Sequence, residues 1–203
     1  MLRPMKSLLK NNFMYNWQKY INNTKNQEPK RLLVRALEFV KNKDTALDVG
    51  AGALNDSKLL QNNGFKKIYA IDIEKNTESI KELDGQVFTF KKIAIEDYNF
   101  SANFFDLINA QFVLFCINKN DLIRIIDDIK KSLRSGGIFV GQFLGSNDSW
   151  SNQSNVYTHS RLEAEEILSD LEIIDLNEEE KDAITAMGES KHWHLFHFIA
   201  RKI

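Results

Sequence analysis

From residue 45 onward, short apolar segments alternate with single amphipathic segments, and this alternation constrains the fold more than any other feature of the sequence. Apolar runs of strand length lie at residues 45–50, 67–73, 87–93, 105–110 and 138–143. Residues 121–133 have the clearest helical periodicity, with an apolar stripe of Leu122, Ile125, Ile126, Ile129 and Leu133. Apolar strands joined by single helices predict an α/β fold with a parallel sheet that helices cover on both faces.

The end of the chain departs from this alternation. Residues 158–171 predict one more helix, and two closing strands follow at 171–176 and 192–202. Their joining segment, 177–191, is too short for a crossover helix with its loops, so the last two strands are predicted to be antiparallel. The acidic run 178–182 within this segment is interpreted as a solvated connection.

Composition excludes several classes of protein. A net charge of -1 argues against a broad phosphate-binding surface, and charged residues interrupt every apolar run well before membrane-spanning length. The single cysteine, Cys116, excludes an intrachain disulfide and a multi-cysteine metal site. No signal peptide is visible in the sequence. We therefore expect a cytoplasmic protein with no nucleic-acid or membrane partner and no metal.

The turn after the first predicted strand contains two glycines. Gly50 and Gly52 allow the backbone to turn tightly and approach a ligand closely, and this turn faces the ligand crevice of an open sheet. A dinucleotide fingerprint needs Gly or Ala where this chain has Asn55. The carboxylate of Asp48 would also repel a pyrophosphate. An acid at this position suits a ligand with a positive amine.

Further acidic residues follow the second and third predicted strands. Asp72 ends the second strand, where a carboxylate can accept hydrogen bonds from both hydroxyls of a ribose. The alternative role for Asp72 is a helix N-cap. After the third strand, the amides of Ile95 or Glu96 could donate to an adenine nitrogen, and a carboxylate of Glu96 or Asp97 could accept from the exocyclic amine. The alternative is a solvated acidic loop.

With these features, residues 30–203 resemble the class I S-adenosylmethionine-dependent methyltransferases. The resemblance is carried by residues 47–52, 70–73, 95–97, 105–108 and 133–139. Within that superfamily, the chain is most similar to small bacterial methyltransferases of the tellurite-resistance type. The resemblance implies a Rossmann-like, doubly wound sheet of seven strands, mostly parallel, with an antiparallel strand at the C-terminal end.

The resemblance also implies S-adenosyl-L-methionine as the cofactor. The expected cofactor-binding residues are Asp48, Gly50, Ala51 and Gly52 around the methionine moiety, Asp72 at the ribose with Ile73 beside it, Ile95 and Glu96 at the adenine, and Gln111 near the sulfonium. The chain departs from the family pattern at two positions. Leu54 stands where many members have a third glycine, and Ala94 stands where many have an acid.

No catalytic residue is predicted, because methyl transfer from a sulfonium is an in-line displacement for which a dedicated base is optional. The substrate-binding candidates are Trp17, Tyr20, Phe115, Trp150, His192 and His194. In a strand, the two histidines point to the same face and could bind a metal, but no cysteine or acid pattern completes such a site. Substrate binding, base catalysis and ordinary packing stay open for them.

The leading hypothesis is therefore a methyltransferase for a small-molecule acceptor. The alternatives are a non-catalytic protein that binds S-adenosylmethionine or another nucleoside, and a NAD-dependent oxidoreductase. We expect a single domain over residues 1–203, because no repeat or low-complexity linker divides the chain. Its predicted parts are an N-terminal helical lid at 1–28, a cofactor-binding half at 29–145, and a helix with a closing hairpin at 146–203. The acceptor and the oligomeric state are not predicted.

Overall fold

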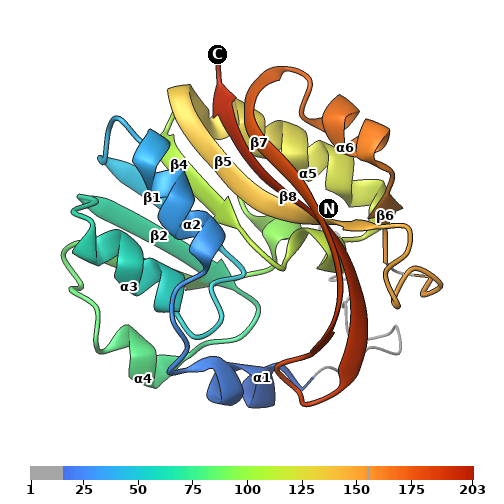
Figure 1. Ribbon diagram of the computed structural model, residues 1–203. Coiled ribbons are helices and arrows are strands. Elements are labelled where there is room, and N and C mark those ends of the chain that lie inside the picture. Colours follow the sequence, from blue (N-terminus) through green and yellow to red (C-terminus); the bar gives the residue numbers. More distant parts are fainter. Residues whose placement is uncertain (1–15, 155) are drawn as a thin grey trace, which may run out of the picture.

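A mixed sheet forms the centre of the computed structural model, which describes residues 16–154 and 156–203 (Figure 1). Over these residues the sheet has eight strands in the order β3-β2-β1-β4-β5-β8-β7, and β6 pairs with β5 outside this path. The strands are β1 (Thr45–Val49), β2 (Lys67–Asp72), β3 (Phe88–Lys92), β4 (Phe105–Ala110), β5 (Leu133–Gly145), β6 (Thr158–His159), β7 (Leu171–Ile184) and β8 (Ser190–Lys202). β8 is antiparallel to both β5 and β7, and the other pairs are parallel. The predicted fold class is confirmed.

The predicted count of seven strands was wrong, because the short strand β6 adds an eighth. Helix α6 (Arg161–Ile167) starts later than expected, after a capping box in which Ser160 and Glu163 exchange hydrogen bonds. The two residues before this cap are therefore extended, and they pair with the end of β5.

The closing hairpin is much longer than predicted, and the acidic run 178–182 is largely exposed, as expected, but is not a connection between the strands. These residues belong to β7, where Glu180 lies opposite His194 and Asp182 lies opposite His192. Opposite charges on facing residues stabilise an antiparallel pair. The strand periodicity of this run was hidden because its side chains are almost all charged.

Helices cover both faces of the sheet and separate the core into two main layers. On one face, α5 (Lys119–Ser132) and α6 pack against apolar residues such as Leu47 and Phe139. On the other face, α2 (Arg31–Ala36) and α3 (Asn55–Asn62) pack against residues such as Ala46 and Val140. The remaining helical segments are α1 (Trp17–Thr24), α4 (Thr77–Ile80) and the 3-10 turns η2 (Leu37–Phe39), η3 (Ile95–Asp97) and η4 (Leu114–Cys116).

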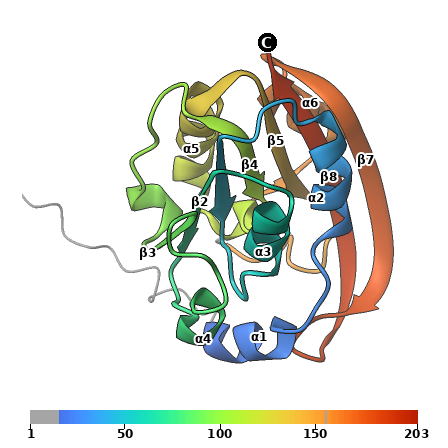
Figure 2. The same cartoon turned by 90° about the vertical axis from the view of Figure 1, so that its left-hand side faces the viewer.

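Helix α1 lies beside the tip of the β7–β8 hairpin, as both views show (Figures 1 and 2). The side-chain amide of Asn23 donates to the carbonyl of Ala186 at the tip, at 2.8 Å. The side-chain amide of Asn55, at the start of α3, donates to the carbonyl of Thr24, also at 2.8 Å. These contacts hold α1 between the hairpin and the turn that follows β1. Among the described residues, no helix is long and apolar enough to cross a membrane.

Candidate functional site

A pocket opens next to the ends of β1 and β4, where the strand order of the sheet reverses. It holds about 480 Å³ of space, part of it open to solvent. Of the predicted cofactor-binding residues, it is lined by Asp48, Gly50, Ala51, Gly52 and Gln111. Of the predicted substrate-binding residues, only Tyr20 is among the lining residues. The lining also includes residues that the sequence interpretation did not select, namely Thr24, Gln27, Glu28, Lys30, Ala53, Asn55, Asp56, Asn109 and Phe112.

The glycine turn between β1 and α3 forms one wall of this pocket. Gly50 and Gly52 have φ angles of 67° and 49°, which favour glycine. A Cβ atom at Gly50 would lie 2.8 Å from the Cβ of Val113, whereas a Cβ at Gly52 would have no neighbour closer than 3.9 Å. Gly50 is therefore required by packing against the segment after β4, and Gly52 leaves free space on the pocket side.

A chain of buried polar side chains crosses the ends of β1, β4 and β5. Asp48 accepts hydrogen bonds from Ser57 Oγ at 2.6 Å and from Asn109 Nδ2 at 2.8 Å. Asn109 Oδ1 accepts from Gln111 Nε2 at 2.8 Å, and Gln111 Oε1 accepts from Gln142 Nε2 at 3.1 Å. Each side chain thus restricts the next, so the polar groups that face the pocket are held in place by groups behind them.

Two carboxylates of this site are linked by one amide. Asn109 Nδ2 donates to Asp48 Oδ1 and also to Asp56 Oδ2, which lies 3.1 Å away. Burial, followed by the nearby charge of Asp56, raises the pKa of Asp48 to about 7. Burial also raises the pKa of Asp56. The hydrogen bond that Asp56 accepts from the backbone N–H of Lys30 lowers this pKa, but by less. The two acids make this part of the pocket suited to binding a positively charged group.

Asp72 lies at the end of β2 and contacts the glycine turn, but it is not among the residues that line the pocket. Its Oδ2 accepts from the backbone N–H of Gly52 and its Oδ1 accepts from that of Glu74, both at 2.8 Å. Burial raises the pKa of this carboxyl. The second hydrogen bond is a local turn contact and not the helix N-cap named as the alternative role, because α4 begins only at Thr77. The next residue, Ile73, leaves 37% of its surface exposed.

The two residues expected near the adenine lie in the 3-10 turn η3, away from the pocket lining. Ile95 is buried in the core beneath α5. Glu96 is half-buried, and burial together with the charges of Asp121 and Asp97 raises its pKa. The position of this turn after β3 is as expected, whereas its contact with adenine stays a prediction.

Four aromatic rings form a cluster that meets the pocket at Phe112. The ring of Phe112 lies edge-on to the rings of Phe115 and Trp193, with centroids 6.4 and 5.8 Å apart. Trp150 lies 5.9 Å from Phe115 and 5.5 Å from Trp193. The ammonium of Lys191 lies over both indoles, at 4.3 and 4.1 Å, and forms a buried ion pair with Asp148. Phe115 and Trp150 therefore pack in this cluster instead of lining the pocket.

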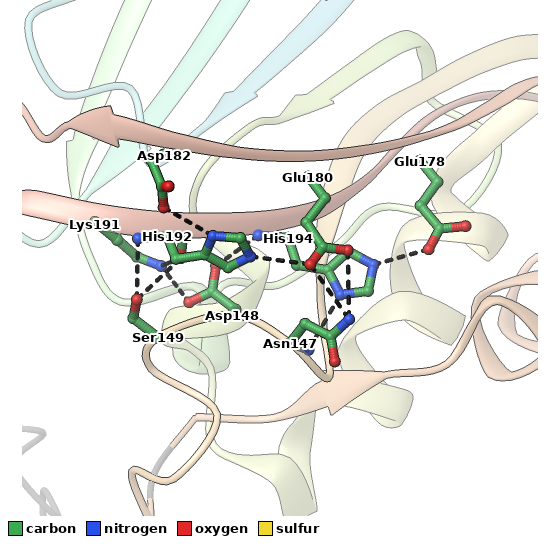
Figure 3. A network of polar contacts seen from close by, with 9 residues as sticks. All are labelled: Asn147, Asp148, Ser149, Glu178, Glu180, Asp182, Lys191, His192 and His194. Atoms are coloured by element: carbon green, nitrogen blue, oxygen red, sulfur yellow. Dashed lines mark hydrogen bonds and ion pairs between the residues drawn. The ribbon is translucent and has the colours of Figure 1, made fainter.

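The two predicted histidines bind carboxylates of β7 (Figure 3). His192 lies between Asp182, 2.8 Å from Nδ1, and Glu180, 3.0 Å from Nε2. His194 Nε2 lies 2.9 Å from Glu178, and its Nδ1 accepts from the backbone N–H of Asn147. Neither histidine lines the pocket. Over the part of the chain that the structure describes, no cluster of three or more potential ligands is arranged for a metal ion.

Of the two aromatic residues predicted in the N-terminal lid, Trp17 and Tyr20, one lines the pocket and the other does not. The ring of Trp17 packs edge-on against that of Tyr20 at 6.0 Å, but only Tyr20 is among the lining residues. Of the pocket residues that the interpretation did not select, Asn109 had a visible signal, because it is a polar residue inside an apolar strand. Asp56 and Lys30 had none, because their contacts join segments far apart in the sequence.

Comparison with known proteins identifies the fold. Residues 47–141 match the methyltransferase domain family. TehB from Haemophilus influenzae is similar over 84% of this chain and 61% of its own, with a TM-score of 0.68 and 21% identity. A 1,6-didemethyltoxoflavin-N1-methyltransferase from Burkholderia thailandensis, solved with S-adenosylhomocysteine, is similar over 85% of this chain and 78% of its own, with a TM-score of 0.65 and 17% identity. The chain has the class I methyltransferase fold.

The chain also matches two curated proteins whose name gives a different activity. The human and mouse proteins named "Arginine-hydroxylase NDUFAF5, mitochondrial" are 28% identical to the chain over 116 residues, which is 57% of its length. The chain matches only 33% of the length of these relatives. The resemblance predicted from the motifs is confirmed at the level of the methyltransferase fold.

Proposed function

We propose that the chain is an S-adenosylmethionine-dependent methyltransferase that acts on a small-molecule acceptor. The observation that carries this proposal is the pocket at the reversal of strand order, where Asp48, Gly50, Gly52 and Gln111 meet. A methyltransferase of the same fold that was solved with S-adenosylhomocysteine, the demethylated form of this cofactor, supports it. The near-neutral net charge favours a small acceptor over a nucleic acid.

The residues of the pocket fit the chemical groups of the cofactor. Its ammonium group suits the carboxylates of Asp48 and Asp56, and its carboxylate suits the ammonium of Lys30, whose Nζ lies 5.2 Å from the centre of the Phe112 ring. The ribose suits Asp72, and the half-exposed Ile73 offers an apolar contact for the adenine. The free space beside Gly52 leaves room for the ligand.

The cofactor, when bound, supplies an electrophilic methyl group. The chain's own residues then need to align the acceptor and keep water out. Gln111, whose side-chain oxygen accepts from Gln142, offers the pocket an amide that is held in place. Phe112 and Tyr20 offer apolar walls, and Asn109 holds the two carboxylates in place. No residue is assigned as a general base.

One alternative has support from the comparisons. The curated relatives are named as arginine hydroxylases, so hydroxylation of an arginine side chain is a second candidate reaction for this chain. A NAD-dependent oxidoreductase is disfavoured, because a pyrophosphate would lie beside the carboxylates of Asp48 and Asp56. We also propose a cytoplasmic location, on the basis of composition alone; the relatives are named as mitochondrial.

Calorimetric titration with S-adenosylmethionine, S-adenosylhomocysteine and NAD tests the cofactor. We expect both sulfur nucleosides to bind and NAD not to bind; binding of NAD alone would refute the proposal. Incubation with methyl-labelled cofactor and a panel of metabolites tests the reaction. Transfer of label to a small molecule supports the proposed class of acceptor, whereas transfer to protein in a cell extract contradicts it. Binding without any transfer would favour the non-catalytic alternative.

A further inference from the structure

The aromatic ring of Phe112 has a cation over its face inside the pocket. The ammonium of Lys30 lies over this ring, 5.2 Å from its centre, and both residues are among those that line the pocket. A cation within about 6 Å of a ring centre is attracted by the negative charge of the ring face. The face of Phe112 is therefore a place in the pocket where a positive charge is stabilised.

The Phe112 ring is held in place by three other segments. Its backbone has a φ of 57°, and the backbone N–H donates a hydrogen bond to Gln142 Oε1 on β5. Its ring packs against Phe115 in η4 and against Trp193 on β8. Strained residues that their surroundings hold in this way cluster at functional sites. We expect the ring to keep its position when the ammonium moves away, because none of these contacts involves Lys30.

Lys30 is anchored through its backbone, whereas its side chain is able to move. The backbone N–H of Lys30 donates to Asp56 Oδ1 at 2.8 Å, at the start of α3. The charge of its ammonium also lowers the pKa of Asp56. A lysine has a flexible stem of four carbons. The ammonium can therefore exchange the Phe112 ring for another partner in the pocket while the backbone contact is kept.

Acidic groups outnumber basic ones among the lining residues that the structure describes. Glu28, Asp48 and Asp56 are acidic, whereas Lys30 is basic. The proposed cofactor has an ammonium, a sulfonium and a carboxylate, and so brings a net positive charge. A formal excess of negative charge remains in the pocket when this cofactor is bound. An acceptor that carries a positive charge offsets this excess.

The position of Phe112 in the sheet assigns its ring to the acceptor. The residues proposed for the adenosine, Asp72 and Ile73, are at the end of β2, on one side of the reversal of strand order between β1 and β4. Phe112 follows β4, on the other side of the reversal, and packs on Trp193 of β8. The end of the pocket beside β4 is thus left for the molecule that receives the methyl group.

We propose that the acceptor is an organic cation whose positive group binds the face of Phe112, and that Lys30 occupies this face until the cofactor binds. This inference rests on the proposed function, in which the ammonium of Lys30 pairs with the carboxylate of the cofactor. Lys30 then leaves the ring, so the cofactor binds first and the acceptor second. The cation orients the acceptor. A protonated or quaternary nitrogen has no lone pair, so the methyl group is transferred to another atom of the same molecule.

Binding of choline and of 3,3-dimethylbutan-1-ol tests the inference on the unmodified chain. The two molecules have the same shape, and only choline is positively charged. NMR titration of the ligand signals measures both dissociation constants, with and without saturating S-adenosylhomocysteine. With S-adenosylhomocysteine, we expect choline to bind at least about fivefold more tightly than the neutral alcohol, because a partly shielded ring face attracts a cation. Without it, we expect this preference to disappear, because the ammonium of Lys30 occupies the ring.

Two substitutions assign the roles of the ring and of the ammonium. Phe112→Leu keeps an apolar side chain but removes the ring face, so we expect the preference for choline to be lost. Lys30→Met removes the ammonium but keeps the backbone contact with Asp56, so choline is preferred even without S-adenosylhomocysteine. Tyr157→Leu is the matched control, because the ammonium of Lys119 lies over the Tyr157 ring at 4.4 Å, outside the pocket lining. This control is expected to bind both ligands as the unmodified chain does.

The outcomes separate this inference from the proposed function. If S-adenosylhomocysteine does not bind, the proposed function fails. If it binds but choline is not preferred over the alcohol, the cation site is refuted and the proposed function stands. Retention of the preference in Phe112→Leu, or its loss in Tyr157→Leu, also refutes the assignment to Phe112.

The role of Lys30 has its own test. An equal preference for choline with and without S-adenosylhomocysteine in the unmodified chain overturns this role, and so does the lack of a preference in Lys30→Met alone. If Phe112→Leu does not fold, the two ligands on the unmodified chain and on Lys30→Met decide the question.

Discussion

The side-chain oxygen of Gln142 accepts a hydrogen bond of 2.9 Å from the backbone N–H of Phe112, a residue with a φ of 57°. A positive φ is strained for an aromatic residue, so surrounding contacts must hold it. Successive residues of a strand point to opposite sides of the sheet. The positive φ of Phe112 ends this alternation after β4, so Gln111 and Phe112 both line the pocket. The shape of the pocket therefore depends on Gln142, which is buried and does not line it.

We expect Gln142→Leu to destabilise the fold by about 1–3 kcal/mol, because it leaves the partly buried backbone N–H of Phe112 without an acceptor. Urea denaturation measures this change. Gln61→Leu is a matched control, because Gln61 also accepts from a backbone N–H, that of Asp84, but at an exposed site where water replaces it. Equal losses in the two variants would contradict the role of burial.

Substitution of Gly50 tests the close approach of the glycine turn to Val113. Gly50→Ala is expected to destabilise the fold by about 2–4 kcal/mol, since it combines a positive φ with a contact of 2.8 Å. Gly64→Ala has a φ of 83° but no atom within 4 Å, so only the backbone cost of about 1–2 kcal/mol is expected. Thermal unfolding of both variants checks the difference. A loss at Gly64 as large as at Gly50 would exclude a steric role for Val113.

Leu54 occupies the position where a glycine was expected from the family pattern, and its φ is 66°. Its side chain is fully buried, so removal of the side chain costs about 2–5 kcal/mol, more than the relief of about 1–2 kcal/mol from a relaxed backbone. We therefore expect both Leu54→Ala and Leu54→Gly to be destabilised, with the glycine variant the more stable of the two. Chemical denaturation of the pair measures the difference. The reverse order would show that the backbone at this position is not strained.

The pKa values of His192 and His197, two histidines of β8, are expected to shift in opposite directions. Hydrogen bonds and charge from Asp182 and Glu180 raise the pKa of His192, whereas burial lowers the pKa of His197 (Figure 3 shows the surroundings of His192). NMR titration of the ring protons, assigned with His192→Gln and His197→Gln, should place them above and below 6.5.

The two shifts have opposite effects on stability. The contribution of His192 is present below pH 6.5 and is lost as the pH rises through its raised pKa. The contribution of His197 is present above pH 6.5 and is lost as the pH falls toward its lowered pKa. Unfolding of the two variants as a function of pH checks both signs. Identical pKa values for the two histidines would contradict the geometry.

Asp72→Ala is expected to weaken the binding of S-adenosylhomocysteine at least tenfold, or about 1.4 kcal/mol, through loss of a charged hydrogen bond to the ribose. Calorimetry measures this directly. Asp84→Ala is the control, because Asp84 makes the same kind of turn contact as Asp72. Asp84 Oδ1 accepts from the backbone N–H of Gln86, and Asp72 Oδ1 accepts from the backbone N–H of Glu74. An unchanged affinity in Asp72→Ala would leave that residue only its turn role.

Part of the site was predictable, because local rules apply to it. The Asp48-to-Gly52 turn and Gln111 each follow an apolar strand, and parallel strands that end at one edge bring such residues together. Asp56 could not be selected with them, since the contact that joins it to Asn109 spans 53 positions in the sequence. Among the aromatic candidates, Tyr20 lines the pocket, whereas Trp150 packs on Trp193 and Lys191, in a cluster that only the long hairpin creates.

The sequence by itself determined the alternation of strands and helices and the glycine turn, because both depend on periodicity and backbone sterics within a few residues. The tertiary structure decided the length of the closing hairpin and the positive φ of Leu54. The charged run of β7 has no apolar alternation, and it is extended because His192 and His194 face its acids across the pair. Leu54 keeps a strained backbone because the burial of its side chain outweighs the strain. Such balances depend on contacts between distant segments, and the local pattern does not contain them.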